Sequence, residues 1–136
     1  MKTRIILLLL FLCVPQTLYA QEVKPQITKP QITENSIVRL SCIEVDPAQL
    51  TEYCRFAEEC GRTSMAKEPG VLFMFSMADK RQPNKITILE VYTDRAAYES
   101  HIKSPHFQKY KQGTIKMVQK LELLDQTPLI PDMRMK

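Results

Sequence analysis

The sequence predicts an α+β domain in which four strands form one antiparallel sheet and two helical segments cover one of its faces. Three observations support this class. Four segments alternate or are wholly apolar, at 37–45, 71–77, 86–92 and 121–126; two stretches with helical periodicity separate them; and turn or capping residues stand at the junctions. The order is βαββαβ, which right-handed crossovers fold into the ferredoxin-like arrangement. We expect a single domain over residues 37–127.

The first half of the pattern is a strand, a helix and a second strand. Asp46 is predicted to cap the helix, Pro47 suits its first position, and Gln49 completes a capping box. The helix is expected to end near Met65 and to bury the stripe Leu50, Tyr53, Cys54, Ala57 and Cys60. A Pro-Gly turn at residues 69–70 then leads into the strand at 71–77.

The second half repeats this order after a loop at 79–85. Asp94 or Thr93 is expected to cap a short helix that ends near Lys103. Ser104 and Pro105 then begin another helical segment, which is predicted to run to about residue 119. The last strand covers 121–126, and residues 128–136 form a tail.

The N-terminal region predicts export. Residues 1–20 combine a basic start at Lys2 and Arg4 with an apolar run at 5–14 and end at Ala20, which is typical of a signal peptide. The run is shorter than the roughly 20 residues that span a bilayer. We therefore expect a periplasmic or secreted protein with no membrane association after cleavage, preceded by an extended, proline-containing leader at 21–36.

Charge and cysteine content exclude several functions. Loss of Lys2 and Arg4 lowers the net charge from +4 to +2, so nothing indicates a nucleic-acid partner. Cys42, Cys54 and Cys60 would remain, and either three small buried thiols or a bond between Cys42 and Cys54 is compatible with their spacing. No metal-binding spacing, phosphate-binding glycine loop or dinucleotide motif occurs, so no metal and no cofactor is predicted.

Candidate catalytic residues cluster between residues 90 and 106. Glu90 and Tyr92 share one strand face with Ile86 and Ile88, while His101 shares a helical face with Ala97 and Tyr98. These side chains are expected to meet in a pocket between helices and sheet. A histidine satisfied by a backbone carbonyl in a small core remains an alternative.

Further candidates are one histidine and a set of aromatic side chains. His106 follows Pro105 in the first turn of a helix, where a neutral imidazole could accept a proton or help to hold an anion; a surface histidine is the alternative. Substrate-binding walls are expected from aromatic residues that core packing could also explain, namely Phe73, Phe75, Tyr98, Phe107 and Tyr110. Because the strands at 71–77 and 86–92 are apolar on both faces, a homodimer through the uncovered sheet face is predicted.

Three stretches resemble the antibiotic biosynthesis monooxygenase family, whose members are quinol monooxygenase-like dimeric α+β barrels. They are Glu-Pro-Gly-Val-Leu at 68–72, Leu-Glu-Val-Tyr-Thr-Asp at 89–94 and His-Ile-Lys-Ser-Pro-His-Phe at 101–107. The resemblance implies a homodimer that oxidises a quinol or related electron-rich aromatic with O2, without metal or flavin. It further implies His101 as the base, Glu90 or His106 as the group that orients it, and Tyr92 as a hydrogen-bonding partner of substrate or reduced oxygen.

Other members of the family have other activities, of which one stays open for this chain and one is not expected. Some relatives isomerise small metabolites. The haem-degrading relatives carry a tryptophan where this chain has Tyr92 and a histidine where it has Lys111, and the sequence contains no tryptophan, so haem degradation is not expected. The alternative outside catalysis is an exported protein that only binds a small hydrophobic ligand.

Overall fold

The computed structural model describes residues 32–130. The predicted signal peptide at 1–20 lies outside the described residues, as do most of the leader and of the tail. Within the described range, no helix is both long enough and apolar enough to cross a membrane.

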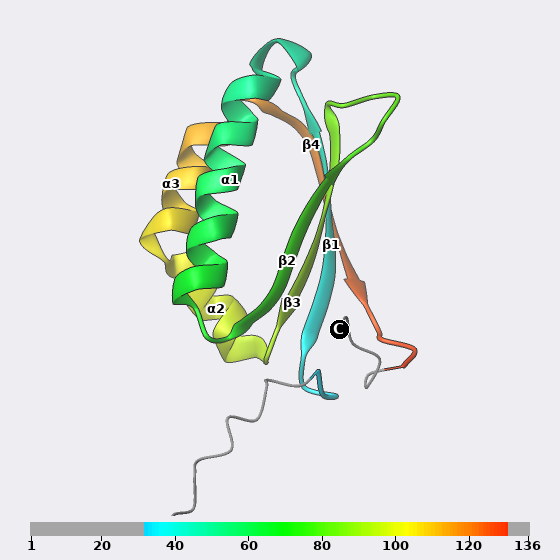
Figure 1. Ribbon diagram of the computed structural model, residues 1–136, viewed down its shortest axis with the longest axis vertical. Helices are drawn as coiled ribbons and strands as arrows, with labels where there is room; N and C mark the ends of the chain where they lie inside the picture. The colour runs from blue at the N-terminus through cyan, green and yellow to red at the C-terminus, as the bar shows by residue number, and fades with distance from the viewer. Residues whose placement is uncertain (1–31, 131–136) are drawn as a thin grey trace, which may run out of the picture.

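Four strands form one antiparallel sheet in the order β2-β3-β1-β4. They are β1 (Ile37–Val45), β2 (Val71–Ala78), β3 (Lys85–Tyr92) and β4 (Val118–Gln126). The two central strands pair without interruption from Ile37 opposite Tyr92 to Glu44 opposite Lys85. The helices lie together on one face of this sheet and leave the other face bare (Figure 1). The predicted ferredoxin-like α+β arrangement is confirmed.

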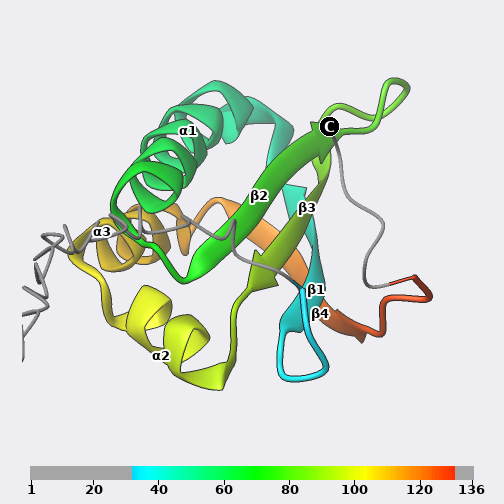
Figure 2. The ribbon, with the colours of Figure 1, turned by 60° about the horizontal axis from the view of Figure 1, so that its bottom comes forward.

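The helical layer consists of α1 (Leu50–Lys67), α2 (Arg95–Lys103) and α3 (Pro105–Thr114), with a short 3₁₀ turn, η1 (Pro47–Gln49), before α1. α1 and α3 pack against each other, and the shorter α2 lies beside one end of them (Figure 2). The predicted capping residues are confirmed, but the capping box is not: the Gln49 side chain donates to the Asp46 carboxylate, and the Asp46 amide donates to the carbonyl of Met117. Asp46 accepts from the amide of Ala48 and begins η1, while Asp94 and Ser104 accept from backbone amides at the starts of α2 and α3.

The core lies between the sheet and α1. It is built from Ile43, Val45, Tyr53, Ile86 and Ile88. Cys54, predicted to belong to the buried stripe of α1, is exposed instead. The buried positions of the helix are Tyr53, Cys60 and Ser64, and their spacings of seven and four residues return to the same face. Cys42, Cys54 and Cys60 are all free thiols, so the Cys42–Cys54 disulfide is absent.

The junction of α3 and β4 differs from the prediction. α3 ends at Thr114 rather than near residue 119, and β4 begins at Val118 rather than at Leu121. Val118 pairs with Val45, and the carbonyl of Met117 accepts from the amide of Asp46. Pairing with the end of β1 therefore supplies backbone hydrogen bonds that end the helix early.

Candidate functional site

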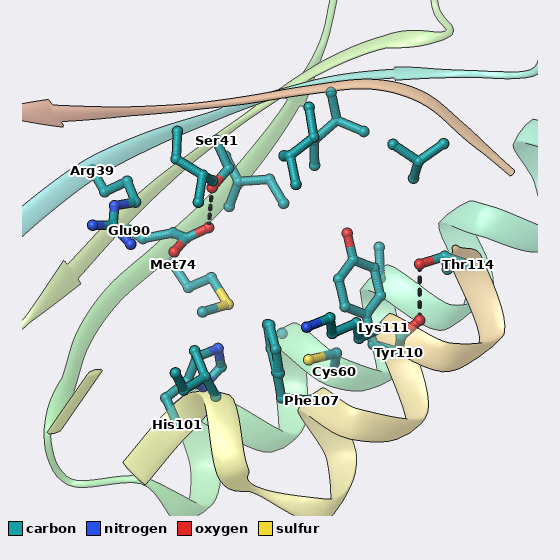
Figure 3. Close-up of a pocket in the computed structure, with 18 of the residues that line it drawn as sticks. Arg39, Ser41, Cys60, Met74, Glu90, His101, Phe107, Tyr110, Lys111 and Thr114 are labelled. Atoms are coloured by element: carbon teal, nitrogen blue, oxygen red, sulfur yellow. Dashed lines mark hydrogen bonds between the residues drawn. The ribbon is translucent and has the colours of Figure 1, made fainter. Parts of the chain in front are cut away.

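A cavity of about 710 Å³ lies between the helical layer and the inner face of the sheet. Its walls come from all four strands and from α1, α2 and α3. Its lining is divided in character. Arg39, Ser41, Glu90 and His101 provide polar groups at one end, and Lys111 and Thr114 add polar groups farther along (Figure 3). The apolar part of the lining includes Ile43, Met74, Ile88, Phe107, Val118 and Leu123. Such a cavity suits a small aromatic or hydrophobic molecule with a polar group at one end.

The sheet side of the polar end is organised around Glu90. Ser41 Oγ donates to Glu90 Oε1 at 2.7 Å, and the Tyr92 hydroxyl donates to Oε2 at 2.9 Å. Arg39 lies opposite Glu90 in the strand register, but its Nε donates to Asp125 Oδ1 at 2.7 Å. Each carboxylate oxygen of Glu90 thus accepts one hydrogen bond from the protein and keeps capacity for another.

The helix side of the polar end is formed by His101. This residue is 2 % exposed, lines the cavity and lies across from Glu90, with Met74 between them (Figure 3). Its Nδ1 is 2.9 Å from Glu68 Oε1. Because an ionised carboxylate only accepts hydrogen bonds, we assign the ring proton to Nδ1, which leaves Nε2 with an unshared electron pair.

Glu68 holds both histidines of the chain. His106 Nε2 lies 2.6 Å from the same Oε1 atom and 3.1 Å from Ser104 Oγ. Burial raises the pKa of the Glu68 carboxyl, but the hydrogen bonds from His101 and His106 outweigh this effect, so the pKa of Glu68 is lower than its ordinary value. The group that orients His101 is therefore an ionised carboxylate.

Aromatic rings enclose the polar end. The rings of His101 and Phe107 meet edge to face with centroids 4.8 Å apart, and Tyr92 packs against Tyr98 at 5.5 Å. Tyr110 also lines the cavity, and its hydroxyl lies 2.8 Å from that of Tyr53. Burial raises the pKa of Tyr92, with a further contribution from the nearby Glu90 charge, so the phenol stays protonated and donates to that carboxylate.

Several predicted site residues share the cavity, and others do not. Glu90, Tyr92, Tyr98, His101, Phe107 and Tyr110 all line it. Phe73 and Phe75 do not line it; they lie on the opposite face of the sheet, because β2 directs Met74 and Ser76 inward. His106 does not line the cavity; it contacts Glu68, which does not line it either.

Glu68 is the residue that sequence reasoning missed. The sequence predicts Glu90 or His106 as the group that orients His101, whereas in the structure His101 Nδ1 donates to Glu68, 33 residues earlier in the chain. The available signal was its place in the Glu-Pro-Gly turn before β2. No local periodicity links that turn to α2.

Comparison with known proteins is consistent with this fold. The family model described as "Antibiotic biosynthesis monooxygenase" matches residues 37–113. A crystal structure of a proposed antibiotic biosynthesis monooxygenase from Bacteroides thetaiotaomicron VPI-5482 is 56 % identical, covers 76 % of this chain and 98 % of that chain, and superposes with a TM-score of 0.75. No curated protein matches.

Two further solved structures extend the comparison. A proposed monooxygenase from Lactobacillus acidophilus NCFM is 32 % identical with a TM-score of 0.65, and the match covers 69 % of this chain and 45 % of that one. A proposed family member from Caulobacter crescentus CB15 is 20 % identical with a TM-score of 0.62, covers 74 % and 94 % of the two chains, and shows the shared fold. On the family match over more than half of its length, this chain belongs to the antibiotic biosynthesis monooxygenase family.

Proposed function

We propose that the protein is a cofactor-independent monooxygenase that oxidises a quinol or a related electron-rich small aromatic with O2, with His101 as the general base. The observation that supports this most directly is that the two nitrogens of the His101 ring have different tasks: Nδ1 is bound by Glu68, and Nε2 remains available to the substrate. Glu68 holds Nδ1 at 2.9 Å, and the ring itself lines the cavity. An imidazole held in this way presents a basic nitrogen to a bound phenol.

Glu90 is proposed to bind the substrate at the opposite wall. Its carboxylate is fixed by Ser41 and Tyr92 and can accept a hydrogen bond from a second substrate hydroxyl. The Tyr92 hydroxyl, which donates to Glu90, then positions this acceptor rather than the substrate. A quinol has two hydroxyl groups on opposite sides of one ring, and the cavity offers acceptors on two facing walls (Figure 3).

The proposed reaction begins with proton transfer from a substrate hydroxyl to His101 Nε2. The resulting phenolate gives one electron to O2, and the two radicals combine to form a carbon–oxygen bond on the ring. His101 returns the proton to the terminal oxygen, and water is lost as a carbonyl forms. One quinol and one O2 thus give one hydroxyquinone and one water, and the apolar walls keep bulk water from the reactive anion.

Oxygen uptake with a panel of hydroquinones, in the presence of a chelator, tests this proposal. Wild-type protein is expected to consume O2 in a one-to-one ratio with at least one substrate. His101→Gln should lose about 10²- to 10⁴-fold in kcat, the usual contribution of a general base. His106→Gln, which removes the imidazole outside the cavity lining, should lose less.

A second pair of variants tests the positioning role of Glu68. Glu68→Gln can donate as well as accept, so it no longer fixes the tautomer of His101, and kcat should fall by between about 10- and 10⁴-fold with little change in KM. Glu58→Gln is the matched control, because Glu58 is an exposed residue of α1, the helix that Glu68 follows, and pairs with Arg62.

Three results would contradict the proposal. Full activity in His101→Gln would show that His101 is not the general base. Saturable binding of hydroquinones without O2 uptake would favour the noncatalytic binding protein. Conversion of a small metabolite without O2 consumption would favour an isomerase on the same fold.

A further inference from the structure

The two histidines of this chain converge on one carboxylate oxygen. The whole sequence contains only two histidines. Glu68 Oε1 is 2.9 Å from His101 Nδ1 and 2.6 Å from His106 Nε2, and the three candidate ligand atoms all lie within 4.8 Å of one another. The residues come from the end of α1, from α2 and from the first turn of α3. Three separate elements therefore place one donor atom each at a single point.

We propose that Glu68, His101 and His106 form a binding site for a divalent transition-metal ion, with Zn²⁺ the best fit. Two imidazole nitrogens and one carboxylate oxygen make up a ligand set that binds Zn²⁺ tetrahedrally, with water in the fourth position. Imidazole ligands favour such ions over Ca²⁺ and Mg²⁺, which prefer all-oxygen sites.

Small side-chain shifts would bring the three ligand atoms to the spacing of a loaded site. With bonds of about 2.0–2.1 Å, neighbouring ligand atoms of a tetrahedral ion are about 3.3 Å apart. The two contacts to Glu68 Oε1, at 2.9 and 2.6 Å, must therefore lengthen, and the two imidazole nitrogens, which lie within 4.8 Å of each other, must settle at that same spacing. The side chains of Glu68 and His106 are 14 % and 15 % exposed, whereas that of His101 is 3 % exposed. An ion can therefore enter from the His106 side, and the packed His101 ring provides a fixed ligand.

Metal binding changes the proton distribution without changing the proton count. In the metal-free site, His101 carries its proton on Nδ1, and His106 donates through Nε2 to Glu68. Coordination of these two atoms requires each neutral ring to carry its proton on the other nitrogen. The site is largely buried, and the single carboxylate of Glu68 compensates part of the charge of the dication.

This tautomer change makes the site inhibitory, a consequence that rests on the proposed function. With Nδ1 bound to metal, His101 holds a proton on Nε2 and has no electron pair to accept one from substrate. Glu68 and His106 do not line the cavity, so the ion binds behind His101 and does not occupy the substrate's place. Inhibition by Zn²⁺ should therefore lower kcat rather than raise KM.

The binding test uses protein without a histidine tag, titrated with Zn²⁺ by calorimetry and with Co²⁺ by visible absorption. We expect one ion per chain and the absorption bands of tetrahedral cobalt. Loss of a ligand should exceed the about 10- to 100-fold cost of losing a supporting hydrogen bond, so His106→Gln and Glu68→Gln should each weaken binding more than about 100-fold. Melting temperatures establish that both variants remain folded.

The matched control is Cys54→Ser, because Cys54 is an exposed thiol that could hold a metal ion on its own. Its affinity should equal that of the wild type. The proposal is overturned if no stoichiometric binding occurs, if binding survives in both His106→Gln and Glu68→Gln, or if Cys54→Ser abolishes it.

The readouts separate this proposal from the proposed function. Stoichiometric binding that is lost in the variants supports the site even if no hydroquinone is oxidised, an outcome that would overturn only the monooxygenase. Oxygenase activity that persists in fully Zn²⁺-loaded protein would overturn the inhibitory role.

Discussion

At the scale of single residues, the environment of each side chain decides its chemistry. Glu68 and Glu90 are both partly buried carboxylates near His101, yet they receive different donors. Glu68 accepts from two imidazoles, whereas Glu90 accepts from the hydroxyls of Ser41 and Tyr92 and lines the cavity. One carboxylate therefore orients the proposed base, and the other is available to substrate.

Differences in burial likewise predict the reactivity of the cysteines. Burial raises the pKa of the Cys60 thiol to about 11, and this residue lines the cavity, whereas Cys54 on the same helix is exposed. Because the thiolate is the reactive form, iodoacetamide near neutral pH should modify Cys54 well before Cys60. Peptide mass spectrometry over time measures both. Equal rates for the two cysteines in folded protein would contradict this burial.

At the scale of elements, the break between α2 and α3 creates the histidine cluster. In one continuous helix, His101 and His106 would be five residues apart and about 140° apart around the axis, facing different directions. Ser104 instead ends α2 in an extended conformation and caps α3, with Pro105 at the first position. The change of direction between the two helices brings both rings onto Glu68.

The position of α2 also depends on a glycine. A Cβ atom at Gly70 would lie 2.5 Å from the Cβ of Ala97 in α2 and 3.3 Å from Thr93 Oγ1. Gly70→Ala should therefore displace α2, which carries His101, and lower the free energy of unfolding by about 1–3 kcal/mol. Denaturant titration measures this change.

Gly61→Ala provides the control for that substitution. Gly61 lies within α1, and its added Cβ would meet only Met74 Sδ at 3.8 Å, an ordinary contact. Alanine is favoured over glycine inside a helix, so stability should rise by about 0.5–1 kcal/mol. If the two variants were equally stable, the close approach at Gly70 would not limit the packing of α2.

At the scale of the whole molecule, the helices account for only one face of the sheet. On the other face, Phe73 and Phe75 pack with ring centroids 6.1 Å apart, and Phe75, Met77 and Leu124 are 53 %, 40 % and 44 % exposed. This bare face is visible beside β1 and β4 in Figure 1. Apolar side chains concentrated on an open sheet mark a surface that a partner covers.

We predict that a second copy of the chain covers this face and forms a homodimer. Phe75→Lys should then shift the protein toward monomer, because a charge would be buried in the interface. Met65→Lys is the control, since Met65 is 45 % exposed on α1, away from the sheet face. Sedimentation velocity distinguishes the two, and a wild-type protein that is monomeric at micromolar concentration would contradict the prediction.

Local patterns determined the order of the elements and most of their ends. The caps at Asp46, Asp94 and Ser104 involve residues within three positions of each other, and alternation in β3 placed Glu90 and Tyr92 on one face with Ile86 and Ile88. Such hydrogen bonds and periodicities are properties of short segments, so the sequence alone can indicate them.

Tertiary packing decided what depends on distant partners. Both faces of β2 are apolar, so alternation could not show that the helices would cover Met74 rather than Phe73 and Phe75. Pairing of Val118 with Val45 ended α3 early, and the meeting of Glu68 with His101 joins residues 33 positions apart. These outcomes depend on which surfaces pack together, and that free-energy balance is set by the whole chain rather than by any one segment.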